Sequence, residues 1–204
     1  PLVGLMTQGT SATTQHHAVC AIESLALNSS ENCAALAKAK ALAPLVSLLT
    51  CERDETRERA RCTLIYLASH DESRGRAVAR RLVALLEGAD TSGASARAKS
   101  PAIASACSAL GTLAARDITI HNAIMQAGAL SSIVRLLSEG PKPDVSCELV
   151  ATAASSALCH LVRSDETLEQ LVSLGGVSPL VTLLTGESKI AQTNAASMLC
   201  RLCA

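Results

Sequence analysis

Cysteine and histidine are the residue types in this chain that could bind a metal ion or act as nucleophiles. The chain contains nine cysteines: Cys20, Cys33, Cys51, Cys62, Cys107, Cys147, Cys159, Cys200 and Cys203. Cys200 and Cys203 have the two-residue gap of half a zinc site, but no second half follows them. The odd number and irregular spacing argue against a secreted disulfide scaffold. We interpret the cysteines as small apolar residues in a reducing compartment, and we expect no metal and no cofactor.

The histidines offer no recognisable catalytic arrangement either. They are scattered along the chain as His16, His17, His70, His121 and His160. None has a cysteine or an acidic residue at a spacing that recurs in catalytic or metal sites, so we expect surface or groove histidines. His16 and His17 are adjacent, and their rings should point to different sides of a helix. The sequence also lacks a nucleophile elbow, a phosphate-binding loop and recurring paired carboxylates. It predicts that the protein is not an enzyme and has no small-molecule substrate.

The composition excludes several classes of partner. The 204 residues contain 18 Lys and Arg and 18 Asp and Glu, with one Tyr, no Phe and no Trp. A nucleic-acid surface needs an excess of basic residues, and single-stranded bases need aromatic platforms for stacking. Polar residues interrupt every stretch of about 18 residues, so membrane insertion is not expected. Abundant Ala and Leu favour helices and predict an all-α soluble protein. We expect a cytoplasmic location, with the nucleus as an additional one.

One pattern recurs five times and places three side chains on one face of a helix. An Ala is followed four residues later by an aliphatic residue and three residues after that by Leu. The copies are Ala18-Ile22-Leu25, Ala60-Leu64-Leu67, Ala106-Leu110-Leu113, Ala154-Leu158-Leu161 and Ala195-Leu199-Leu202. Their final leucines are 42, 46, 48 and 41 residues apart. Repetition at this period predicts a helical solenoid.

Two further elements precede copies of this pattern, the first in all five units and the second in three of them. The first is a pair of apolar residues followed two positions later by another pair, as in Ile133-Val134 with Leu136-Leu137. It recurs at 2–6, 45–49, 82–86 and 180–184. The second is a short helical stretch that ends at a glycine, as in 122–130 and 171–177, with a weaker copy at 35–42. Glycine suits a sharp turn at a helix C-terminus. Each unit should therefore contain a short, a medium and a longer helix.

This three-helix pattern resembles the armadillo repeat across nearly the whole chain. The matching residues are the Ala-Gly-Ala-Leu turn at 127–130, the helix at 133–137 and the helix at 154–161. The resemblance implies an all-α, right-handed α-solenoid of about four to five three-helix repeats. The expected units are 1–30 (partial), 31–70, 71–116, 117–164 and 165–204 of a single array. HEAT repeats, with two helices per unit, are the alternative.

The units differ in length. Residues 87–101 and 138–146 are expected to form longer surface loops between the second and third helices. The gap from Leu67 to Leu82 is short, which predicts a clipped first helix and an irregular stacking step. The last helix carries Met198, Leu199 and Leu202 with nothing after it to cover them. We therefore expect the chain to be a fragment of a longer array.

The resemblance also locates a candidate binding surface, because third helices line the concave side of armadillo arrays. In the nuclear-import receptors of the family, each third helix presents a Trp and, four residues later, an Asn. The Trp positions here hold Cys20, Cys62, Ser108, Ser156 and Ser197, and the Asn positions hold Ser24, Tyr66, Thr112, His160 and Arg201. None is a Trp or an Asn, so import of a basic signal peptide is not expected.

The remaining positions predict a shallow, mildly polar groove. Tyr66 is an interface anchor if it faces this groove, and a gap filler between units otherwise. The alternating charges at 53–61 indicate a solvated helix with internal ion pairs, or a basic site for an acidic partner. The basic residues of that patch are Arg57, Arg61, Arg74, Arg76, Arg80 and Arg81. We expect a scaffold or adaptor that binds a protein or peptide. The alternative is a structural spacer in a larger protein, such as a ubiquitin-ligase or a vacuole or junction adaptor.

Overall fold

The structure is a computed structural model that describes residues 1–7, 9–27, 29–69, 71–88, 94–138 and 145–203. The described residues form helices and connecting turns, without strands. The helices are η1 (Leu2–Met6), α1 (Ala12–Ala26), α2 (Ser30–Lys38), α3 (Leu42–Leu48), α4 (Asp54–Ser69), α5 (Glu72–Glu87), α6 (Ala94–Arg116), α7 (Ile118–Gln126), α8 (Ala129–Ser138), α9 (Val145–Leu161), α10 (Asp165–Ser173), α11 (Val177–Leu184) and α12 (Lys189–Leu202).

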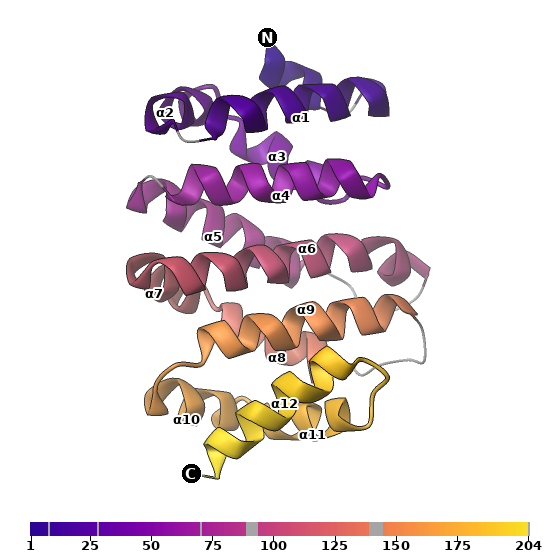
Figure 1. Ribbon diagram of the computed structural model, residues 1–204, viewed down its shortest axis with the longest axis vertical. Coiled ribbons are helices and arrows are strands. Elements are labelled where there is room, and N and C mark those ends of the chain that lie inside the picture. Colours follow the sequence, from indigo (N-terminus) through magenta and orange to yellow (C-terminus); the bar gives the residue numbers. More distant parts are fainter. Residues whose placement is uncertain (8, 28, 70, 89–93, 139–144, 204) are drawn as a thin grey trace.

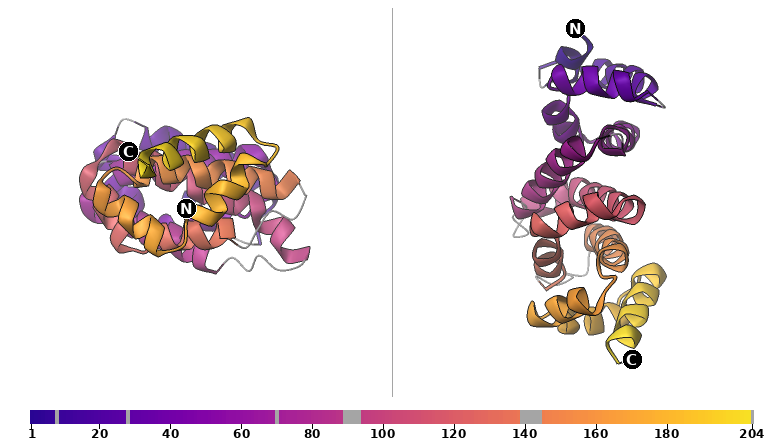
Figure 2. Two further views of the ribbon diagram at one scale, coloured as in Figure 1. Left: turned by 90° about the horizontal axis from the view of Figure 1, so that it is seen from below. Right: turned by 90° about the vertical axis from the view of Figure 1, so that its left-hand side faces the viewer.

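The helices stack into an elongated array with the two termini at opposite ends (Figure 1). The longer helices α1, α4, α6, α9 and α12 lie side by side in one layer, and each packs against the next. The shorter helices and α5 lie behind this layer, as the side view in Figure 2 shows. This arrangement confirms the predicted all-α solenoid.

The repeated Ala-aliphatic-Leu pattern forms the core of the array. Each of its five alanines is buried on a helix of the front layer. The aliphatic residue that follows is fully buried in the first four copies. The final Leu is buried in the three inner copies, whereas Leu25 is exposed and Leu202 is half-buried. A third of the chain is Ala and Leu, and these small and medium side chains let neighbouring helices approach closely.

Local signals account for the helix boundaries. Ser11, Ser29, Asp71, Ser164 and Ser188 each accept a hydrogen bond from a backbone N–H in the first turn of their helix. The sharp turns before α8 and α11 place their glycines in the left-handed region of the backbone map, as follows: Gly128 at φ +85° and Gly175 at φ +75°. The weaker copy of this turn before α3 has Lys40 in that conformation, at φ +59°.

The third unit is the irregular one. Helix α5 is continuous from Glu72 to Glu87, so the short first helix and the second helix are joined into one. This follows from the absence of a turn glycine, because Gly75 lies inside the helix and packs against Ile120. The prediction of a loop at 87–101 is wrong for residues 94–101, since α6 begins at Ala94. Alanine-rich sequence favours helix there and tolerates Pro101 within it. The other expected loop, 138–146, lies mostly outside the described residues.

Within the described ranges, no single helix has both the length and the apolar character needed to cross a membrane. The pair α10 and α11 meets those criteria only together, across a bend of 89°.

Candidate protein-binding groove

The ten predicted groove residues all lie on the front layer of helices. Each of α1, α4, α6, α9 and α12 contributes two of them, and all ten are half-buried or exposed. They are Cys20, Ser24, Cys62, Tyr66, Ser108, Thr112, Ser156, His160, Ser197 and Arg201. Side chains at these positions are therefore at least partly accessible to a ligand. Their exposure differs along the array. Residues that line the same hollow of this surface could contact one ligand together.

One hollow runs across α4, α6 and α9 and has a volume of about 460 Å³. We call it the central groove. Its lining residues are Asp54, Arg57, Glu58, Arg61, Pro101, Ala104, Ser105, Ser108, Leu149, Thr152, Ala153 and Ser156. Ser108 and Ser156 were predicted from the repeat alignment, as were Arg57 and Arg61 from their charge. The groove thus combines hydroxyl groups on α6 and α9 with a charged wall on α4.

Two ion pairs organise the charged wall. Arg57 pairs with Asp54 one turn earlier and also donates to the carbonyl oxygens of Cys51 and Glu52. Arg61 forms two hydrogen bonds to the carboxylate of Glu58, at 2.9 and 2.5 Å. The hydrogen bond from Arg61 lowers the pKa of Glu58, and the same bond raises the pKa of Arg61. The wall is therefore polar but locally neutral, which confirms the expectation of internal ion pairs.

Small residues hold α6 and α9 close together beside the groove. A Cβ atom added at Gly111 would lie 3.0 Å from the Cα of Ala157 and 3.5 Å from the Cδ2 of His160. Gly111 therefore allows direct contact between the two helix backbones, one turn beyond Ser108. On the next helix, the Asn194 side chain donates to Ser155 and Ser156 at 3.2 and 3.0 Å. These contacts keep the spacing of α6, α9 and α12 fixed.

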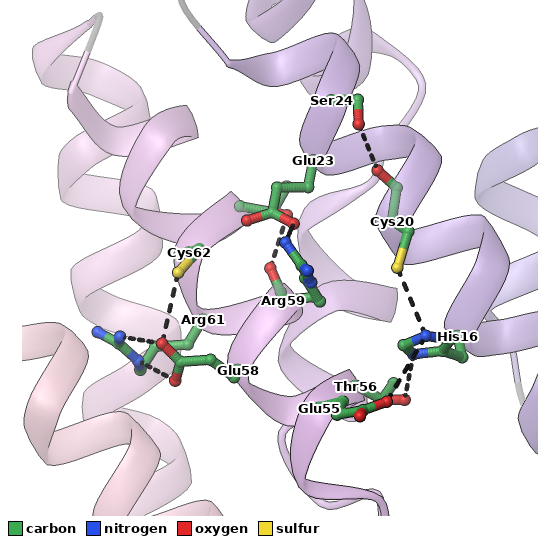
Figure 3. A network of polar contacts seen from close by, with 11 residues as sticks. His16, Cys20, Glu23, Ser24, Glu55, Thr56, Glu58, Arg59, Arg61 and Cys62 are labelled. Carbon is green, nitrogen blue, oxygen red and sulfur yellow. Dashed lines mark hydrogen bonds and ion pairs between the residues drawn. The ribbon is translucent and has the colours of Figure 1, made fainter.

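A second hollow of about 450 Å³ lies between α1 and α4. Its lining residues are His16, Glu23, Glu55, Glu58, Arg59 and Cys62. Figure 3 shows the polar contacts around it: Arg59 donates to Glu23 at 2.9 Å, and Cys62 donates to Glu58 at 3.6 Å. Burial is the main cause that raises the pKa of the Cys62 thiol, so the sulfur is protonated at neutral pH. Glu58 lines both hollows, so the two adjoin at this residue.

The histidines divide between this surface and the core. The Nδ1 of His16 lies 3.2 Å from the hydroxyl of Thr56, and its Nε2 lies 3.9 Å from Glu55. His160 is exposed on α9. His121 corrects the expectation of surface or groove histidines, because it is buried and its Nε2–H donates to the carbonyl oxygen of Leu161 at 2.8 Å. His70 lies outside the described residues.

Metal binding finds no support in the geometry of the described ranges. The rings of His16 and His17 have centroids 5.6 Å apart, closer than expected for side chains on different sides of a helix. Even so, the described residues contain no group of three or more His, Cys, Asp or Glu side chains arranged to hold a metal ion. Burial raises the pKa of the Cys107 thiol to about 12, which makes it a poor thiolate ligand.

Several predicted residues lie apart from the central groove. Tyr66 is half-buried and packs against the hydrophobic core. The hydroxyls of Ser24 and Thr112 donate to carbonyl oxygens one turn earlier in their own helices. Arg201 donates to the carbonyl oxygen of Val162 and lines a separate hollow of about 410 Å³ between α10 and α12. The structure therefore groups only part of the predicted set.

The predicted basic patch is divided between two layers. Arg57 and Arg61 lie on α4 in the central groove, whereas the other four arginines lie on α5 behind the front layer. On α5, Arg76 pairs with Glu72 at 2.8 Å and Arg74 lies 3.9 Å from Asp71. Arg80 and Arg81 are exposed. The six residues do not form one positive surface, because acidic neighbours offset most of their charge.

Sequence reasoning missed part of the lining of the groove. Ser105 and Thr152 lie three and four residues before the predicted Ser108 and Ser156, and Leu149 lies seven before Ser156. Residues at these spacings share one helix face. Extending each predicted position by one and two turns toward the helix N-terminus would have found them. Glu23 and Glu55 of the α1–α4 hollow needed the packing of two helices and had no such signal.

Comparisons with known proteins address the fold. No protein-family profile and no curated protein sequence matches the chain. Among solved structures, a crystal structure of an engineered protein is 28% identical, with a TM-score of 0.64 over 98% of this chain and 77% of that one. Computationally designed armadillo repeat proteins for modular peptide recognition are 24% identical, with a TM-score of 0.61 over 97% of this chain and 79% of that one. The chain has an armadillo-like repeat fold.

A further armadillo-type structure shows the same architecture with a ligand. A designed armadillo repeat protein in complex with the peptide (KR)4 is 23% identical, with a TM-score of 0.63 over 98% of this chain and 84% of that one. At this identity the likeness describes the fold alone. In the armadillo-like array described here, the central groove is built by three successive third helices, α4, α6 and α9.

Proposed function

We propose that the protein is an interaction scaffold that binds an extended peptide segment of a partner in the central groove. The observation that carries this proposal is the continuous hollow across α4, α6 and α9. Its volume of about 460 Å³ is similar to that of pockets that hold small molecules, about 300–1,000 Å³, so it can take a short part of an extended peptide. The proposed mechanism is binding and presentation of a partner, with no bond made or broken.

The lining of the groove defines the chemistry of the peptide. Hydroxyl groups of Ser105 and Ser108 both donate and accept, so they suit the N–H and C=O groups of an extended backbone, whereas the Thr152 hydroxyl already pairs with that of Ser188 at 2.7 Å. The exposed side chain of Leu149, with nearby alanines, offers an apolar contact for a small aliphatic side chain. The paired charges of Arg61 and Glu58 favour a polar partner over a strongly charged one, because neither is free to neutralise a ligand charge.

A displayed library of random peptides tests the proposal and does not require the partner to be identified first. Peptides selected on the wild-type chain should lose about tenfold or more in affinity for Ser108→Arg, because the long side chain occupies the groove. Ser197→Arg is the matched control, since Ser197 is the repeat equivalent on α12 and lines none of the described hollows. Leu149→Glu is a second groove variant at an exposed position that the fold tolerates.

The alternative function is a structural spacer without a ligand of its own. That function predicts no enrichment of peptides on the wild-type chain. It also predicts that any weak binder is retained equally by Ser108→Arg, Leu149→Glu and Ser197→Arg. Either result would count against the scaffold proposal.

A further inference from the structure

A cysteine and a histidine form a polar pair on α1. Cys20 follows His16 by one helical turn, so the two side chains share one side of the helix. The Sγ of Cys20 lies 3.7 Å from the Nε2 of His16, and Figure 3 shows the two side chains turned toward each other. Imidazole is the side-chain base that accepts a proton near neutral pH, and the thiolate is the nucleophilic form of cysteine. The pair therefore has the two components of an activated nucleophile.

Helix α4 holds the imidazole in position. The Nδ1 of His16 lies 3.2 Å from the hydroxyl of Thr56, a residue that is fully buried. With a proton on Nδ1 donated to this hydroxyl, Nε2 is the nitrogen that can accept the proton of the Cys20 thiol. The carboxylate of Glu55 lies 3.9 Å from the same Nε2. A negative charge at this distance stabilises the imidazolium that forms when the thiol proton is transferred.

The other neighbours of α1 add one further charged pair. Arg59 on α4 donates to Glu23, and this bond is the main cause that raises the pKa of Arg59, to which the charge of Cys20 also contributes. The guanidinium is thus within electrostatic reach of the sulfur. Helices η1 and α2 also pack against α1. The residues of η1 carry no titratable side chain, and α2 hydrogen-bonds to α1 at Leu25 and Ala26, beyond Glu23.

Cys62 provides a comparison within the same chain. It occupies the equivalent repeat position on α4, and both cysteines are half-buried. Access to Cys20 therefore follows from its repeat position and does not depend on α1 being the first long helix. The partner differs, because the Cys62 thiol donates to the carboxylate of Glu58. Burial, and then the charge of Glu58, raise the pKa of Cys62. This thiol stays protonated, whereas the thiol of Cys20 faces a base.

We propose that Cys20 is a modification site, at which the thiol exchanges with a small, uncharged disulfide to form a mixed disulfide. The Nε2 of His16 takes the thiol proton, and the Cys20 thiolate attacks one sulfur of the disulfide. A new S–S bond forms at Cys20 while the S–S bond of the reagent breaks. The released thiolate takes the proton back from the imidazolium. The disulfide itself is the oxidant, so no other reactant is needed.

The surroundings have room for the reagent and for the attached group. His16 lines the hollow of about 450 Å³ between α1 and α4, which can hold a small disulfide beside the pair. Neither Cys20 nor His16 lines the central groove. The modification is therefore independent of peptide binding in that groove.

The rate of mixed-disulfide formation at each cysteine tests the proposal. The full chain is reduced, freed of reductant and treated at pH 7 with hydroxyethyl disulfide, and mass spectrometry of its peptides measures each cysteine separately. An ordinary thiol, with a pKa of about 8.5, is only about 3% thiolate at this pH. Cys20 should therefore react about tenfold faster than the exposed Cys200, and faster still than Cys62, the matched internal control.

His16→Asn removes the base and keeps a polar side chain. The rate at Cys20 should fall about tenfold at pH 7, while the rate at Cys200 should not change. At about pH 10 a thiol is mostly thiolate without a base, so the rates of variant and wild type should converge. A purely structural role of His16 would leave the ratio of the two rates the same at both pH values. Glu55→Gln is a second variant at an exposed side chain, and it should slow Cys20 by about twofold to threefold at pH 7.

Three outcomes would overturn the proposal. The first is a wild-type Cys20 that reacts no faster than Cys62 or Cys200. The second is a His16→Asn variant whose Cys20 is slowed by the same factor at both pH values, which would indicate altered access. The third is a Glu55→Gln variant, with intact helices by circular dichroism, in which Cys20 reacts as fast as in the wild-type chain.

Discussion

Gly111 controls the contact between α6 and α9, and Gly111→Ala should destabilise the array even though alanine is the better helix former. In a solvated helix, this exchange would stabilise by about 1 kcal/mol. Here the new methyl group would lie 3.0 Å from the Cα and 3.4 Å from the Cβ of Ala157. The first contact is with backbone, so a rotamer change cannot relieve it. Overpacking of this kind costs about 1–3 kcal/mol, which exceeds the gain in propensity.

The expected net effect is a loss of about 1 kcal/mol in the free energy of unfolding, or about 2–4 °C in the melting temperature of a chain of this size. Urea denaturation followed by circular dichroism measures it. Gly4→Ala is the control, because nothing lies within 4 Å of a Cβ at Gly4. If Gly111→Ala is as stable as the wild-type chain or more stable, then α6 and α9 are not in close backbone contact. In that case the close packing of these two helices beside the central groove is wrong.

Two further substitutions should change the free energy of unfolding in a defined direction. Lys40→Gly should stabilise the chain by up to about 1 kcal/mol, because Lys40 has a φ of +59° where the equivalent turns have glycine; a urea midpoint at or below that of the wild-type chain would contradict this. Glu58→Gln should destabilise the chain at pH 7 by less than about 1 kcal/mol, because the Glu58–Arg61 pair is partly solvated. The pKa of Glu58 is lowered in the folded chain, so the pair stabilises above the ordinary value of 4.5, and the difference between variant and wild type should vanish as pH falls through the lowered pKa. A difference that is constant from pH 7 to pH 3 would exclude the ion pair as its cause.

The periodic part of the fold could be predicted from sequence because each repeat position has one environment. The alanines and aliphatic residues of the five triads are small or apolar at a helical spacing, and that spacing alone predicts the buried face. The fusion of two helices into α5 could not be deduced as readily. The missing glycine indicated an irregular step, but whether the chain breaks or continues as helix depends on packing against α4, α6 and α7.

The candidate site was predictable to the extent that it follows the repeat. Ser108 and Ser156 line the groove because equivalent positions on neighbouring helices lie side by side. His121 could not be placed in the same way, since its burial depends on the carbonyl oxygen of Leu161, 40 residues later in the chain. The charge of Arg57 and Arg61 was visible, but its neutralisation required the rotamers of Asp54 and Glu58.

The most direct test of the central claim is a map of backbone amide chemical shifts on addition of a peptide selected on the wild-type chain. The account predicts that the largest shifts fall on the groove-lining residues of α4, α6 and α9, including Ser105, Ser108, Thr152 and Ser156. Residues of α5, which lies behind the front layer, should change little. Shifts confined to α5 and the other rear helices, or no shifts at saturating peptide, would contradict the assignment of the central groove as the binding surface.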